Sequence, residues 1–144
     1  MAELPNKLTG EIVDAAYKLH VALGPGLLES VYELALASDL ERRGLRVERQ
    51  KAIAFAYNGT RFENAFRVDL LVESGVPVEI KSLETLAPVH SKQLLTYLRL
   101  MELPVGLLIN FGAVTLKQGL HRVINFPLPD KNISHRDTEA QRGP

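Results

Sequence analysis

Cysteine is absent from the 144-residue sequence. Disulfide bonds, thiolate metal sites and cysteine nucleophiles are therefore excluded. Any metal ion must be held by oxygen atoms or by imidazole, and such a donor set favours magnesium or manganese over structural zinc.

Long hydrophobic runs are absent too. No apolar segment approaches the roughly 20 residues that a membrane-spanning helix needs. Residues 1–7 lack the apolar stretch of a secretory signal peptide. From these absences we expect a soluble, cytoplasmic protein without a membrane partner.

Neither sign of charge predominates, because 17 basic residues balance 17 acidic ones. Non-specific affinity for nucleic acid comes from neutralising phosphates with lysine and arginine, so a neutral chain cannot bind by overall charge. Two local groups of basic residues remain candidates for such contacts. The first is also compatible with a solvated helix end and strand edge. The first group is Arg42, Arg43, Arg46, Arg49 and Lys51, and the second is Lys81, Lys92 and Arg99.

The composition that remains is that of a globular protein, with 46% hydrophobic and 24% charged residues. The length suits one domain with a real core. We expect a single domain over residues 1–126. From residue 127 the chain becomes polar, and residues 127–144 are expected to form a disordered tail.

Hydrophobic periodicity predicts a single α/β domain. Thr9 is expected to cap the first helix, and the second helix is expected to turn Leu28, Val31, Ala35 and Leu36 toward the core. Asn58-Gly59 is a strong hairpin signal between two strands. The predicted helices cover residues 9–23, 27–43 and 88–101, and the predicted strands cover residues 45–57, 60–73, 76–81, 105–111 and 115–126.

The chemistry-bearing residues lie on two neighbouring predicted strands. A tight turn between these strands can bring Asp69 and Glu79 side by side. Glu79 and Lys81 are two residues apart, so they share one face, while Val78 and Ile80 face the core. Two adjacent carboxylates repel, and a divalent cation removes that penalty. With a lysine beside it, such a pair has the parts needed for phosphodiester hydrolysis. The same alternation also occurs in any half-exposed strand.

Two helices add further polar candidates. Gln93 and Tyr97 are four residues apart on one helical face, where they could contact a phosphate or the attacking water. The alternative is an exposed Gln93 and a Tyr97 packed at the core margin. Glu29 could supply a third carboxylate, or it could simply stabilise the start of its helix.

The order of these residues resembles the PD-(D/E)XK nuclease superfamily, which has an αβββαβ core. The Gln93-x-x-x-Tyr97 element is similar to that of RecB-like nucleases, and Gly26-x-x-Glu29-x-x-Tyr32 resembles the GxxExxY family placed in that superfamily. The resemblance implies a restriction-endonuclease-like α/β fold, with a mixed central sheet flanked by helices. Where the superfamily's name has a proline, this sequence has Val68.

The same resemblance assigns roles to the candidate residues. It implies that Asp69, Glu79 and the Ile80 carbonyl bind Mg²⁺ or Mn²⁺ and that Lys81 is the catalytic lysine. The site would be completed by Glu29, Gln93 and Tyr97.

We therefore expect a metal-dependent nuclease that hydrolyses nucleic acid, DNA rather than RNA, and that can act as a homodimer or in a larger assembly. The alternative is a non-catalytic nucleic-acid-binding or interaction module on the same fold.

Overall fold

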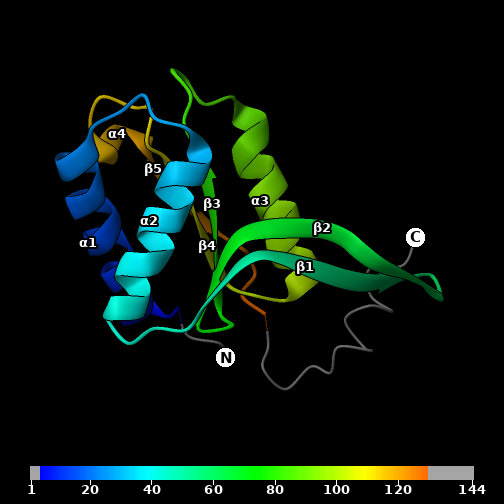
Figure 1. Cartoon of the computed structure of the whole chain (residues 1–144). Helices are drawn as coiled ribbons and strands as arrows, with labels where there is room; N and C mark the ends of the chain where they lie inside the picture. Colours follow the sequence, from blue (N-terminus) through cyan, green and yellow to red (C-terminus); the bar gives the residue numbers. More distant parts are fainter. Residues whose placement is uncertain (1–3, 130–144) are drawn as a thin grey trace.

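The computed structural model describes residues 4–129 of the chain. These residues form one five-stranded sheet in the order β1-β2-β3-β4-β5, with a parallel β3–β4 pair and antiparallel neighbours elsewhere. From α2 to β4 the order of elements is αβββαβ, which confirms the expected mixed sheet flanked by helices (Figure 1). The elements are α1 Asn6–Leu23, α2 Glu29–Arg42, β1 Val47–Tyr57, β2 Thr60–Val72, β3 Val76–Lys81, α3 Pro88–Met101, β4 Val105–Asn110, α4 Leu116–Gly119 and β5 Leu120–Ile124.

The sheet separates two apolar layers (Figure 1). Helices α1 and α2 cover one face, where their side chains pack against Val78, Ile80, Leu107 and Ile109. Helix α3 covers the other face and packs against Leu108. The alternation of side chains along β4 thus divides the two layers. Every residue of β4 is buried, as expected for a central strand covered on both faces.

Strands β1 and β2 form a long hairpin that extends past the rest of the sheet (Figure 1). Its turn residues Asn58 and Gly59 have φ values of 52° and 81°. Such left-handed conformations suit an Asn-Gly hairpin turn, so the expected turn is confirmed. The elements expected at residues 76–81 and 88–101 also have the predicted bounds.

Three local expectations were wrong in whole or in part. Helix α1 begins at Asn6 rather than at a Thr9 cap, because Thr9 lies inside the helix and its hydroxyl donates to the Asn6 carbonyl over 3.2 Å. In α2, Leu36 is buried and Ala35 packs against the core as expected, but Val31 and the preceding Leu28 are exposed, and the buried face also carries Tyr32, Glu33, Ala37 and Leu40. The predicted strand over residues 115–126 is split: Thr115 caps the short helix α4 by accepting from the Gln118 amide, and β5 follows.

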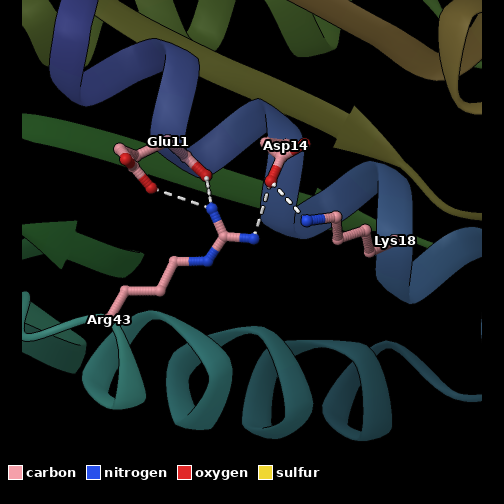
Figure 2. A network of polar contacts seen from close by, with 4 residues as sticks. All are labelled: Glu11, Asp14, Lys18 and Arg43. Atoms are coloured by element: carbon pink, nitrogen blue, oxygen red, sulfur yellow. Dashed lines mark hydrogen bonds and ion pairs between the residues drawn. The ribbon is translucent and has the colours of Figure 1, made fainter.

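An ion-pair network joins α1 to the end of α2 (Figure 2). Arg43 donates to Glu11 Oε2 and Asp14 Oδ2, each over 2.8 Å, and Lys18 pairs with Asp14 over 3.1 Å. The hydrogen bonds from Arg43 and Lys18 lower the pKa of Asp14. The network therefore links α1 and α2, the two helices that cover the same face of the sheet.

Residues 130–144 of the predicted tail lie outside the described residues. Within residues 4–129, no helix combines the length and the apolar character needed to cross a membrane.

Candidate active site

The structure brings Asp69 and Glu79 together where β2 and β3 diverge. The antiparallel register pairs Leu70 with Val78, which places Asp69 level with Glu79 one position further along. The Ile80 amide donates to Asp69 Oδ2 over 2.8 Å. This side-chain hydrogen bond links β2 and β3 beyond the last main-chain pair of the two strands. Glu79 is 7% exposed and Asp69 is half-buried. Two carboxyl groups thus share one small region at the edge of the core.

Burial and charge change the acidity of this pair. Burial, and after it the neighbouring Asp69, together raise the pKa of Glu79 to about 9, and the charge of Lys81 offsets only part of the effect. In the absence of a cation, Glu79 therefore holds a proton at neutral pH beside Asp69. A divalent cation that displaces this proton would remove the repulsion between the two carboxylates.

Lys81 follows Glu79 on the same face of β3 and is half-buried. Its charge acts on Glu79, since it lowers the pKa of that carboxyl group. The intervening Ile80 has a fully buried side chain in the α1/α2 layer, so only its main-chain atoms can take part in a site.

From α3, Tyr97 reaches the same region. Its ring stacks on Phe66 of β2 with centroids 4.1 Å apart and an interplanar angle of 10°. Burial raises the pKa of Tyr97, and the charges of Glu79 and Asp69 raise it further. Gln93 lies one turn earlier on the same flank of α3 and is exposed. The structure therefore brings Tyr97 beside the carboxylates and leaves Gln93 at the surface next to it.

The structure gives two acidic residues of α2, Glu29 and Glu33, different surroundings. Glu29 is exposed at the start of the helix and lines a cavity of about 1060 Å³ together with Glu33 and Asp69. Glu33, which is 7% exposed, is the one connected to Asp69, because the Gln50 side chain donates to Glu33 Oε1 over 2.6 Å and to Asp69 Oδ1 over 3.2 Å.

The sequence reasoning missed both Glu33 and Gln50. One signal for Glu33 was available: it lies three and seven residues before Leu36 and Leu40, on the stripe that α2 buries. A charged residue in a buried stripe needs a partner.

The donor set fits a hard divalent cation. Asp69 and Glu79 offer only oxygen atoms, and a cation between them would oppose the burial and the carboxylate repulsion that raise the pKa of Glu79. Among residues 4–129, no group of three acidic, histidine or cysteine side chains is arranged to hold an ion. Main-chain or water oxygens would have to complete the coordination, a pattern that Mg²⁺ commonly adopts.

In the described part of the chain, the two groups of basic residues differ in whether they are paired with acidic side chains. Every member of the first basic group has an acidic partner within 4 Å, so that group is neutralised at the surface: the pairs are Arg42–Asp39, Arg43–Glu11, Arg46–Glu73, Arg49–Glu33 and Lys51–Glu48.

The second group does not converge on one place. At about 100° per residue, Lys92 and Arg99 both lie roughly 140–160° around α3 from Tyr97, away from the carboxylates. Arg67 is better placed, since it is exposed and lies two residues before Asp69 on the same face of β2. Among the described residues it has no acidic partner within 4 Å.

Tyr32 stabilises the loop between α1 and α2. Its ring is fully buried and stacks on Phe111 with centroids 4.5 Å apart. Its hydroxyl donates to the Gly24 carbonyl over 2.5 Å and accepts from the Leu27 amide over 3.1 Å. Tyr32 thereby fixes the loop between α1 and α2, which forms one wall of the cavity.

Replacing Tyr32 with phenylalanine should therefore destabilise the protein by about 1–3 kcal/mol, because two main-chain groups lose their hydrogen bonds to the tyrosine hydroxyl. Urea denaturation would measure this change. Tyr17→Phe on the exposed side of α1 is the matched control and should leave stability unchanged. Equal stability of the Tyr32→Phe variant and the wild type would contradict this assignment.

The fold and the acidic pair on its central strands define a nuclease-like α/β domain. The sequence model of the PD-(D/E)XK nuclease superfamily matches residues 6–123, and the chain belongs to this superfamily. No curated protein matches the chain. A solved structure described as "Crystal structure of SSO0001" is similar with a TM-score of 0.48 and 12% identity, covering 92% of this chain and 82% of that chain.

Proposed function

We propose that this protein is a metal-dependent nuclease that hydrolyses phosphodiester bonds of nucleic acid, with DNA preferred over RNA. The observation that carries the proposal is the buried Glu79 beside the half-buried Asp69, with Lys81 on the same strand face as Glu79. Membership of a nuclease superfamily supports it, because the matched region includes all of these residues.

Asp69, Glu79 and the Ile80 carbonyl would hold Mg²⁺ or Mn²⁺. Such an ion, when bound, supplies a Lewis acid for the phosphate and lowers the pKa of water. Lys81 places a positive charge beside the carboxylates, where it can orient the attacking water and stabilise negative charge that develops on the phosphate.

The remaining candidates act on the substrate. Tyr97 can position a phosphate through its hydroxyl, because its ring is fixed against Phe66. Gln93, exposed on the same flank of α3, can donate to a phosphate oxygen. Glu29 lines the cavity and can orient water there. Arg67 offers an unpaired charge to a neighbouring phosphate.

Finer assignments belong to the same proposal. We infer that the chain falls in the GxxExxY branch, with a RecB-like Gln-x-x-x-Tyr element, and that residues 1–126 form its single domain. We also infer a cytoplasmic location and assembly as a homodimer, which would let two sites engage two strands of a duplex.

The proposal is tested by cleavage of labelled single-stranded, duplex and branched DNA and of RNA, in Mg²⁺ or Mn²⁺ and with EDTA as a control. We expect wild-type cleavage that EDTA abolishes and that Asp69→Asn lowers at least 1000-fold, about 4 kcal/mol or more in activation free energy. Asp39→Asn, at a surface ion pair of α2, is the matched control and should retain full activity.

Cleavage that survives both EDTA and Asp69→Asn would show that the proposal is wrong. Binding of nucleic acid that needs neither metal nor Lys81, without any cleavage, would favour the non-catalytic binding module instead. The neutralised first basic group leaves few free cations for phosphate contacts under either function.

A further inference from the structure

Gln50 interrupts the regular pairing of the hairpin directly opposite Asp69. Its neighbours are paired, Arg49 with Leu70 and Lys51 with Val68, but Gln50 itself is not among the paired residues of β1. Its φ is 50°, a left-handed conformation that side-chain-bearing residues rarely adopt. Such strain persists only where surrounding contacts hold it in place.

Side-chain contacts of Gln50 explain why the strain persists. One side-chain nitrogen bridges two carboxylates on different elements, Glu33 of α2 and Asp69 of β2, over 2.6 Å and 3.2 Å. Its two N–H groups suffice for one donation to each. Arg49 holds Glu33 from the other side over 3.1 Å. The bridge therefore begins at a buried, ion-paired glutamate and ends at Asp69.

Asp69 is thereby held at both oxygens. Oδ2 accepts from the Ile80 amide and Oδ1 accepts from Gln50, so the plane of the carboxylate is fixed. Each carboxylate oxygen has two lone pairs, which leaves room for an ion beside each hydrogen bond. Groups that orient a metal-binding side chain in this way raise metal affinity.

We propose that Gln50 is the positioning residue of Asp69 and that Glu33 is its anchor on α2. This inference rests on the proposed function, in which Asp69 binds the metal. Neither Gln50 nor Glu33 has to contact the ion or the substrate. The left-handed conformation breaks the regular pairing at Gln50, and the two hydrogen bonds to Glu33 and Asp69 are the contacts that hold it there.

The test measures Mn²⁺ and Mg²⁺ affinity by calorimetry, and the melting temperature without metal, for the full chain. Gln50→Gly removes the amide and relieves the left-handed strain, so we expect an unchanged or higher melting temperature with about 10–100-fold weaker metal binding. Gln50→Leu should weaken metal binding to the same degree. Glu33→Ala combined with Gln50→Leu should weaken it no further than Gln50→Leu alone, because both act through one bridge.

Asn64→Gly is the matched control. Asn64 also has a left-handed φ, 51°, and lies exposed on β2. The same relief of strain there should leave metal affinity unchanged.

Wild-type metal affinity in Gln50→Gly and Gln50→Leu, with binding lost in Asp69→Asn, would overturn the Gln50 inference alone. Absence of metal binding by the wild type would overturn the proposed function and this inference with it.

Discussion

Replacing Lys81 with methionine is expected to lower the metal-dependent cleavage rate by about 100–1000-fold, while the metal is still bound. Methionine preserves much of the length of the side chain and removes its charge. Loss of one group that stabilises transition-state charge typically has an effect of this size. Asp69→Asn is expected to act differently, by removing an oxygen ligand and with it the metal.

Single-turnover rates at saturating Mn²⁺ would measure the effect. Because Lys81 lowers the pKa of Glu79, its loss makes proton competition for the site stronger. Metal affinity should therefore be compared above about pH 9, where that competition is weaker. Lys92→Met, on the far flank of α3, is the matched control. A Lys81→Met variant with the wild-type rate would refute the catalytic assignment.

Replacing Glu79 with glutamine should stabilise the metal-free protein at neutral and alkaline pH. Glu79 titrates at its ordinary value near 4.5 in the unfolded chain and at about 9 in the folded one. Between these values the folded chain holds a proton that the unfolded chain has released, so the free energy of unfolding falls as pH rises. At pH 7 the loss amounts to about 3 kcal/mol, and it is complete above about pH 9.

Glutamine is always neutral and resembles the protonated carboxyl group in shape, so the Glu79→Gln variant lacks this pH dependence. Its melting temperature should exceed that of the wild type by roughly 10 °C at pH 7 in EDTA. The two proteins should be equally stable near pH 4. Parallel stability curves from pH 4 to pH 9 would contradict a raised pKa for Glu79.

The predicted pH dependence has a counterpart in metal binding. An ion at Asp69 and Glu79 must displace the proton on Glu79, so metal affinity should rise with pH toward about pH 9. Stabilisation by Mn²⁺ should then offset the alkaline loss of stability in the wild type and have little effect on the Glu79→Gln variant.

Local signals determined much of this protein. Asn58-Gly59 specified the hairpin, because few residues other than asparagine and glycine accept two successive left-handed conformations. The alternation along residues 76–81 placed Glu79 and Lys81 on one face, since side chains of a strand point to opposite sides in turn. The spacing of Gln93 and Tyr97 likewise set them on one flank of α3.

Other features depended on contacts between distant elements. The buried face of α2 was only partly predictable from its sequence, because apolar residues occur on both sides: Leu36 is buried as expected, but Leu34 is more than half exposed. Three members of the first basic group pair with residues 16 to 32 positions away, so their neutralisation could not be predicted from the sequence.

The link from Glu33 through Gln50 to Asp69 is the sharpest example. This link needs a residue with a left-handed conformation within a strand, and no glycine or turn motif in the sequence predicts one there. It also joins α2, β1 and β2, which are separate elements of the chain. Sequence periodicity determined which residues share a face of each element. Only the tertiary structure decided which faces meet, because hydrogen bonds and burial between elements depend on the packing of the whole domain.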